Sequence, residues 1–289
     1  MIIGDNDDDE QQNIHTQQAA QLAAIETEVK KQDLTSSLFP IQRLVDYYKN
    51  LPDATPGFLQ GASYLGSTRC NYTHFRRVRG DGNCYYRALL YSICEVCLKK
   101  QVHKEQFSAL KDFITASLKH VCQFGYDENA LDMFHEELVD VFDFISTFSD
   151  GTDKLVEEKL KEMHTRLNEE NGSSDYCTWF LRVITAAHLK SDADRFMLFL
   201  DASDDTVNHC LDIATFCARE VEPMGKECGM VQVTALAEAL QVRVNVEYLD
   251  GRDLPDNTKK LMRYEFGPEG ALEVTLLYRP GHYDILYRC

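Results

Sequence analysis

A cysteine follows a turn-forming Asp-Gly-Asn sequence and begins an apolar, helix-like segment in RGDGNCYYRALLYSIC, residues 79–94. At the first turn of a helix, a thiol lies near unpaired backbone N–H groups and the positive end of the helix dipole, and both favour the thiolate. Gly82 lets successive N–H groups point into one concavity, as a tetrahedral oxyanion requires, while Asp81 and Asn83 can hold the loop's shape. Cys84 is therefore a candidate nucleophile. Without a partner base, a turn followed by a core cysteine is the better explanation.

A candidate base lies near the C-terminus. Most of the nine histidines fall within amphipathic helical patterns, where a surface or core position is the usual explanation. His282 instead begins a strand-like segment directly after Pro280-Gly281, and Asp284 follows two residues later on the same strand face. Alone, this His-Tyr-Asp sequence is explained equally well as a polar pair on an edge strand. Together with Cys84 it indicates a set in which the acid orients the imidazole, the imidazole takes the thiol proton and the thiolate attacks.

Other groups of chemically active residues are better explained by packing. Cys94 and Cys97 have redox spacing but lie inside the apolar segment after Cys84, and no second CxxC is present to complete a zinc site. Cys210 and Cys217 fall on one apolar stripe of a helical pattern. The GDG sequence lacks the Lys-Ser/Thr of a P-loop. The sequence therefore predicts neither a metal nor another cofactor.

Composition limits the class of protein and its partners. Thirty basic and 47 acidic residues in a chain of 289 give a net charge of -17, which repels nucleic-acid backbones and anionic lipid surfaces. The N-terminal MIIGDNDDDEQQ lacks the basic and apolar regions of a secretion signal, and no segment has the ~20 consecutive apolar residues of a membrane span. The ten cysteines are scattered irregularly, which favours free thiols. We expect a cytosolic (cytoplasmic) or nuclear protein that binds neither nucleic acid nor membrane.

The N-terminal region is predicted to differ from the remainder of the chain. Residues 1–15 are acidic and without periodicity, whereas residues 17–31 consist of strong helix formers with Leu22, Ile25 and Val29 on one face. That apolar face either packs on the chain's own body or serves as a docking arm. We expect a partly disordered tail and arm over residues 1–40 and a catalytic domain over residues 41–289.

Helical patterns dominate the first two thirds of that domain, and a small sheet ends it. A short helix closed by Pro52 comes first, and segments with apolar residues at every third or fourth position follow. The predicted helices cover 85–100, 104–125, 131–148, 154–170, 173–190, 194–202, 206–220 and 233–241, and the predicted strands cover 242–250, 272–278 and 283–288. Asn171-Gly172 is a helix stop, and Pro280-Gly281 is a turn between the last two strands. The fold class is α/β, of the α+β type.

Several of these segments resemble a known family. RGDGNCYYRAL resembles the Asp-Gly-Asn-Cys block of ovarian-tumour (OTU) domain cysteine proteases, and YRPGHYDILY resembles their C-terminal His block. The segments SDYCTWFLRVITAAHLK, EVEPMGKECGMVQVTALAEAL and VRVNVEYLD resemble the otubain branch, and the N-terminal extension resembles its longer type. The resemblance covers about residues 75–289. It implies a papain-like fold, with a helical lobe and a small mixed sheet that carries the C-terminal His hairpin, and a deubiquitinating thiol protease.

The resemblance also implies a role for each motif residue. These are Cys84 as nucleophile, His282 as base, Asp284 as orienting acid and Asp81 as a support of the oxyanion loop that includes Gly82 and Asn83. Gly80 stands where the family usually has Pro, and Tyr85 where it usually has Phe. These two departures affect the stiffness of the loop but remove no chemical group.

The implied partners are ubiquitin, polyubiquitin and ubiquitin-charged conjugating enzymes. By resemblance, the substrate is the compact, proteasome-targeting linkage, with the distal ubiquitin's tail at Cys84 and the proximal ubiquitin against helix 17–31. The acidic surface suits the arginines of that tail. The longer otubain type also blocks chain synthesis by binding conjugating enzymes, so the alternative is a binding inhibitor with little protease activity. A transglutaminase-like acyl transferase shares the triad chemistry, but the otubain-like segments argue against it.

Overall fold

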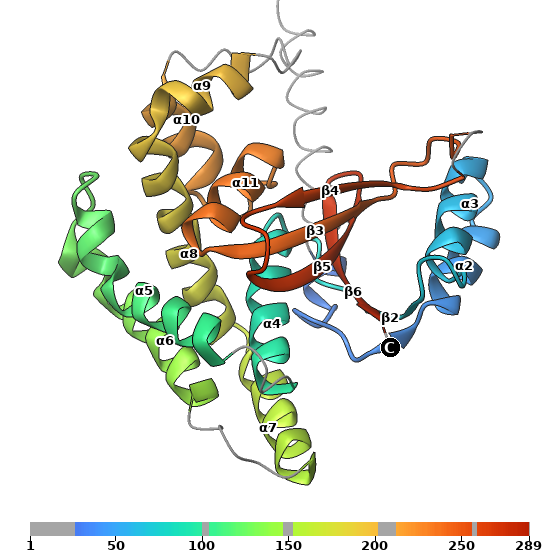
Figure 1. Cartoon of the computed structure of the whole chain (residues 1–289), viewed down its shortest axis with the longest axis horizontal. Helices are drawn as coiled ribbons and strands as arrows, with labels where there is room; N and C mark the ends of the chain where they lie inside the picture. The colour runs from blue at the N-terminus through green and yellow to red at the C-terminus, as the bar shows by residue number, and fades with distance from the viewer. Residues whose placement is uncertain (1–26, 100–103, 147–152, 202–211, 256–258, 289) are drawn as a thin grey trace, which may run out of the picture. The chain divides into compact units, whose positions relative to one another are not determined.

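A six-stranded mixed sheet lies at the centre of the chain from Leu34 onward (Figure 1). The computed structural model describes residues 27–99, 104–146, 153–201, 212–255 and 259–288. The strand order is β1-β2-β6-β5-β3-β4, with β3 and β5 parallel and the other neighbours antiparallel. The strands are β1 (Phe39–Pro40), β2 (Tyr72–Arg76), β3 (Val242–Tyr248), β4 (Met262–Phe266), β5 (Leu272–Arg279) and β6 (His282–Arg288).

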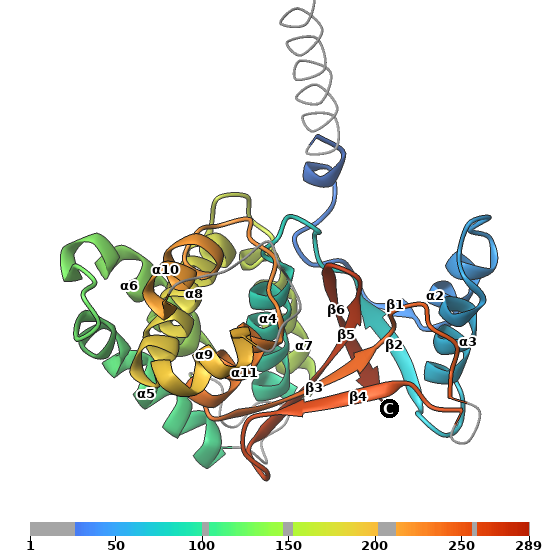
Figure 2. The same ribbon diagram turned by 90° about the horizontal axis from the view of Figure 1, so that it is seen from above.

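The helices form a large lobe on one side of the sheet and a small layer on the other (Figure 2). They are α2 (Gln42–Lys49), α3 (Pro56–Leu65), α4 (Cys84–Lys99), α5 (Lys104–Cys122), α6 (Glu128–Ser146), α7 (Asp153–Arg166), α8 (Ser173–Ser191), α9 (Ala193–Asp201), α10 (Ile213–Phe216), the π-helix η2 (Cys217–Val221) and α11 (Met230–Ala239). This arrangement confirms the predicted fold class, a helical lobe with a small mixed sheet. The predicted strands are β3, β5 and β6, whereas β1, β2 and β4 were not predicted.

Two apolar cores cover the two faces of the sheet. The larger core joins α4 and the helical lobe to β3, β5 and β6. The smaller core joins α2 and α3 to Phe75 of β2, Leu277 of β5 and Leu286 of β6. Because helices cover both faces, four consecutive residues of β6 after His282 are buried. The strand that begins at His282 is therefore held from both sides.

Two predicted helices differ from the observed ones. The prediction of one continuous helix over residues 206–220 is wrong, because a helix begins at Ile213. The side chain of Asp212 accepts a hydrogen bond from the Thr215 N–H at 2.7 Å and caps this helix. Residues 202–211, and with them Cys210, lie outside the described residues. The helix α7 ends at Arg166, before the predicted stop, and Gly172 is the N-cap of α8.

The chain divides into two units, Met1–Asp33 and Leu34–Cys289. In the first unit, residues 27–30 are helical and Val29 is half-buried, while Leu22 and Ile25 lie outside the described residues. The second unit begins at Leu34 and not at residue 41, because β1 pairs with β2 and the Leu34 carbonyl accepts a hydrogen bond from the Arg79 N–H at 3.0 Å. Within the residues that the structure describes, no helix has the length and apolarity needed to cross a membrane.

Candidate active site

The structure brings the three predicted triad residues together. Cys84 is the first residue of α4, and His282 is the first residue of β6. The His282 Nε2 atom lies 2.8 Å from Asp284 Oδ1, which leaves Nδ1 for the thiol. The Tyr283 N–H, between them on the strand, donates a hydrogen bond to Cys84 Sγ at 3.4 Å. The candidate nucleophile, base and orienting acid therefore meet where α4 packs against the β5–β6 hairpin.

Asp284 is a buried carboxylate whose charge is retained. Its Oδ1 atom also accepts the Val78 N–H at 3.0 Å, and its Oδ2 atom binds the Arg279 guanidinium. Burial opposes the charge, but Arg279 and the hydrogen bond to His282 outweigh it and lower the pKa of Asp284 below its usual value. The residue is therefore an anion that fixes the orientation of the imidazole.

His282 carries a proton at neutral pH. Burial lowers its pKa, but the hydrogen bonds and charges of Asp284 and Cys84 outweigh burial and raise the pKa of His282 to about 9. A protonated imidazole beside the substrate can give a proton to a leaving group.

The loop before Cys84 is held by side chains on both sides. The carboxylate of Asp81 accepts the Asn83 N–H at 3.1 Å, and Arg87 donates to both Asp81 oxygens at 2.6 Å. The second amino group of Arg87 donates to Asp175 of α8 at 2.7 Å. Asp81 thus acts through Arg87, which was not predicted, to tie the loop to α4 and α8.

Asn83 has a structural part in this loop. Its N–H is bound to Asp81, and its Oδ1 accepts hydrogen bonds from the Gly225 N–H at 2.9 Å and from Arg182 at 2.8 Å. Gly82, with φ of +77°, approaches the segment at Gly225 so closely that a Cβ atom would lie 2.0 Å from the Gly225 carbonyl oxygen. The predicted backbone freedom of Gly82 is therefore used for a close approach between two loops.

Arg182 of α8 is the main residue of the site that sequence reasoning missed. It is fully buried, and its guanidinium donates to the carbonyls of Gly82, Lys226 and Val221 at 2.7–2.9 Å. No carboxylate lies within 4.0 Å of it in the part of the chain that the structure describes. The available signal was a lone arginine within WFLRVITAA, an otherwise apolar helical segment.

Replacing Arg182 by methionine should slow the reaction while the chain still folds. The loop that carries Gly82 and Asn83 loses its shared anchor, and a displacement of the reacting groups by about 1 Å can cost about 10²-fold in rate. We expect kcat to fall by about that factor on a fluorogenic ubiquitin C-terminal amide, with little change in KM. Arg243→Met, which removes an arginine bound to Glu265 on the sheet, is the control. A loss of cooperative thermal unfolding, or an equal loss in the control, would contradict the positioning role.

Gly80 lies beside the imidazole of His282. A Cβ atom at this position would lie 3.5 Å from His282 Nδ1, in ordinary van der Waals contact. The proline that the resembled family usually carries would therefore place its Cβ atom against the ring, a contact that glycine cannot make. Every chemical group of the predicted triad is nevertheless present.

The other described cysteines are packing residues. Burial raises the pKa of the Cys94 thiol well above its usual value and that of Cys97 to about 12. Cys217 is fully buried in the core around α8 and α10. All eight cysteines in the described ranges are free. In the described part of the chain, no group of three or more His, Cys, Asp or Glu side chains could hold a metal ion.

The site has a thiol at a helix N-terminus, an imidazole bound to a carboxylate, and a loop before the thiol that side chains hold in place. This arrangement defines a papain-like thiol hydrolase. A family model described as Peptidase C65 Otubain matches residues 27–288. The chain belongs to the otubain family of cysteine-type ubiquitin thioesterases.

Relatives and solved structures of this family match three quarters or more of the chain. The ubiquitin thioesterase otubain-like protein of Caenorhabditis elegans is 32% identical over 271 residues, which cover 94% of this chain and 87% of the relative. Human ubiquitin thioesterase OTUB1 is 31% identical over 75% of this chain and 71% of its own. The structure of a ceOTUB1 ubiquitin aldehyde UBC13~Ub complex has a TM-score of 0.73 at 30% identity, covering 93% of this chain and 99% of that chain. The structure of h/ceOTUB1-ubiquitin aldehyde-UBCH5B~Ub has a TM-score of 0.74 at 28% identity, covering 95% and 98%.

Proposed function

We propose that this protein hydrolyses isopeptide bonds of polyubiquitin, with Cys84 as nucleophile, His282 as base and Asp284 as orienting acid. The observation that carries the proposal is the Cys84–His282–Asp284 arrangement, with 2.8 Å between His282 Nε2 and Asp284 Oδ1, in a chain of the otubain family. The preferred substrate is the compact, proteasome-targeting linkage. The distal ubiquitin presents its C-terminal carbonyl to Cys84.

The reaction takes place in two stages at the same thiol. The Cys84 thiolate attacks the carbonyl carbon of the terminal ubiquitin glycine, and a tetrahedral oxyanion forms. His282, protonated at neutral pH, gives its proton to the leaving lysine amine, so that the isopeptide bond breaks and a thioester remains. Neutral His282 then takes a proton from water, which attacks the thioester and releases the ubiquitin carboxylate and the thiol.

Two backbone groups are candidates for binding the oxyanion. The N–H groups of Gly82 and Cys84 donate to no acceptor within the described chain, whereas the Asn83 N–H is bound to Asp81. Cys84 is the first residue of α4 and Gly82 lies in the loop directly before it, so both donors are near the end of the helix where the dipole favours negative charge. Asp81, Asn83 and Arg182 then act by holding these donors in place.

Incubation with ubiquitin dimers of each defined linkage tests the proposal. We expect cleavage of the compact, proteasome-targeting dimer at a rate at least about tenfold above every other isopeptide linkage, because an oriented proximal ubiquitin lowers the entropy cost of reaching the transition state. Cleavage is read on a gel against time. Equal cleavage of all dimers would contradict the linkage preference but leave the hydrolase intact, whereas cleavage of none would contradict both.

A second proposed function is the inhibition of ubiquitin-conjugating enzymes by binding. It is supported by the two similar structures, which are complexes with ubiquitin-charged UBC13 and UBCH5B. We expect deletion of residues 1–33, which leaves the second unit intact from Leu34, to abolish inhibition of chain synthesis by a charged conjugating enzyme. Hydrolysis of a minimal ubiquitin ester should remain, because the triad lies in the second unit. Unchanged inhibition by the shortened chain would show that the predicted arm, including Leu22, Ile25 and Val29, is not needed.

A further inference from the structure

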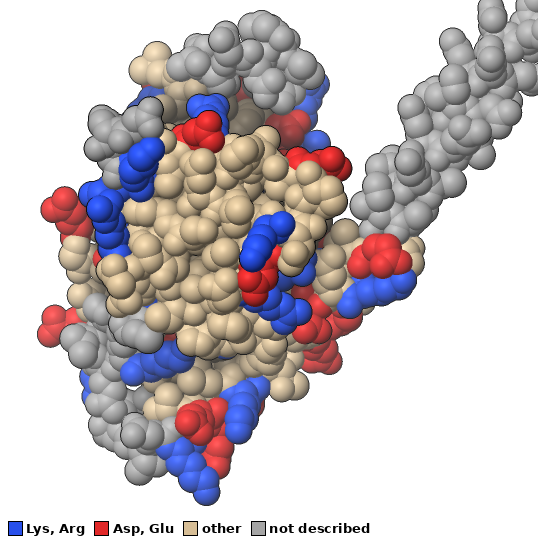
Figure 3. All heavy atoms as spheres, turned by 90° about the vertical axis from the view of Figure 1, so that its right-hand side faces the viewer, with Lys and Arg blue, Asp and Glu red and all other residues tan. Residues whose placement is uncertain are grey.

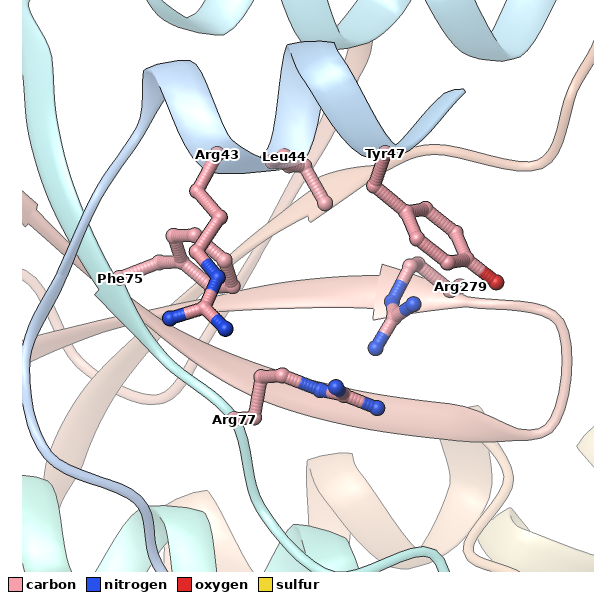
Figure 4. A pocket seen from close by; sticks show the side chains of 6 residues that line it. All are labelled: Arg43, Leu44, Tyr47, Phe75, Arg77 and Arg279. Atoms are coloured by element: carbon pink, nitrogen blue, oxygen red, sulfur yellow. The ribbon is translucent and has the colours of Figure 1, made fainter. Parts of the chain in front are cut away.

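A small pocket lined by arginines lies beside the predicted triad. Figure 4 shows the guanidinium groups of Arg43 on α2, Arg77 after β2 and Arg279 on β5 facing the same space. The other walls are formed by Leu44, Tyr47 and Phe75. The cavity measures about 60 Å³, several times what one water molecule needs by this measure, so it has room for a small oxyanion.

Two of the three arginines in this pocket, Arg43 and Arg77, have no carboxylate partner in the described part of the chain. Among the described residues, no carboxylate lies within 4.0 Å of Arg43 or Arg77, and Arg43 lies over the Phe39 ring at 4.0 Å. Arg279 has one ion pair, with Asp284, and its buried Nε atom has no hydrogen-bond partner in the described chain. Clustered guanidinium groups repel one another, so an anion bound between them would lower the free energy of the site. This cluster is the more unusual because the chain has a net charge of -17.

The surroundings of the pocket favour a protein over a free ion. The segment 54–68, which includes α3, contains no charged residue. Figure 3 shows the side of the molecule over α2 and α3 as a broad uncharged area, with charged side chains mostly around its edge. Tyr47, at the mouth of the pocket, is 51% exposed. An exposed aromatic ring beside Arg43 and Arg77, which lack a carboxylate partner among the described residues, matches the composition of protein interfaces.

We propose that this pocket binds the carboxylate of a glutamate or aspartate side chain that projects from a protein partner. The planar fork of each guanidinium fits a carboxylate, and the apolar walls of Leu44 and Phe75 suit the methylene groups that precede it. Arg279 would then bind the partner's carboxylate on one side and Asp284 on the other. This inference goes beyond the hydrolase and does not depend on its activity.

Binding of a labelled peptide tests the proposal on the full chain. A fluorescein-labelled peptide, Leu-Glu-Leu-Glu-Leu, is titrated by fluorescence anisotropy against its glutamine counterpart, Leu-Gln-Leu-Gln-Leu. We expect the glutamate peptide to bind at least about tenfold more tightly than the glutamine peptide. The double variant Arg43→Gln/Arg77→Gln should remove this preference, whereas Lys49→Gln, which removes a positive charge from α2 outside the pocket, should retain it.

Several outcomes would overturn the assignment. Equal binding of the two peptides, no binding of either, or an unchanged preference in the double variant would each show that the pocket does not bind carboxylates. Inorganic phosphate that displaces the peptide at a lower concentration than acetate does would assign the pocket to phosphate instead. Both substituted arginines are exposed, and a cooperative melting transition confirms that the variant is folded. The single variant Arg77→Gln provides a second measurement, with an intermediate loss expected.

Discussion

Cys84→Ser should abolish the formation of a covalent adduct with a ubiquitin whose C-terminus carries a thiol-reactive group. The hydroxyl of serine is not ionised by a neighbouring imidazolium at neutral pH, so the nucleophile is lost while the volume at the start of α4 is nearly unchanged. Hydrolysis of a fluorogenic ubiquitin amide should fall by roughly 10⁶-fold, the scale of losing the nucleophile of a triad. Intact mass measures the adduct, and peptide mapping places it on Cys84.

The matched control for this variant is Cys97→Ser. Cys97 lies on the same helix, but burial raises the pKa of its thiol to about 12, so it should not react. This variant should form one adduct at the wild-type rate. An adduct on Cys84→Ser, or one on any cysteine other than Cys84 in the wild type, would show that the nucleophile has been misassigned. A folded wild-type chain that forms no adduct would favour the binding-inhibitor alternative.

Asp284→Asn should reduce kcat by about 10²- to 10⁴-fold and shift the pH dependence of activity. Asparagine can keep the hydrogen bond to His282, but it removes the negative charge that compensates for the cost of burying the imidazolium. The pKa of His282 should therefore fall from about 9 towards or below its ordinary value of 6.5. The alkaline limb of kcat/KM should begin near pH 9 in the wild type and at a clearly lower pH in the variant.

The same shift predicts how stability changes with pH. The folded-state pKa of His282 is raised above its unfolded value of 6.5. Protonated His282 therefore contributes to the free energy of unfolding, and this contribution is complete below pH 6.5 and is lost as the pH rises through about 9. Urea unfolding of the wild type should show this loss between pH 6.5 and about 9, and Asp284→Asn should not. Asp143→Asn, which removes an exposed carboxylate paired with Lys111, is the control. A control that shifts equally, or a variant with the wild-type profile, would show that Asp284 does not set the charge of His282.

Local sequence preferences are sufficient to predict the two halves of the site. Asp-Gly-Asn-Cys followed by an apolar helix, and Pro-Gly-His followed by an alternating strand, each have a backbone preference that acts over a few residues. Cys84 at the first turn of α4 and His282 at the first position of β6 were therefore predictable. The spacing of His282 and Asp284 on one strand face made their contact predictable as well.

Burial and long-range packing select the distant residues that complete the site. Arg87, Arg182 and Arg279 come from three different elements; the first two bind groups far away in the sequence, and Arg279 reaches Asp284 across the hairpin turn. No local pattern distinguishes Arg87 and Arg279 from surface arginines, and the apolar neighbours of Arg182 indicate its burial but not its partners, because what sets these roles is burial beside carbonyl and carboxylate oxygens. The short strands β1, β2 and β4 were missed for the same reason, since pairing with neighbouring strands, and not intrinsic preference, defines them. Sequence thus specified the candidate nucleophile and its base, while packing supplied the charges that hold them ready to react.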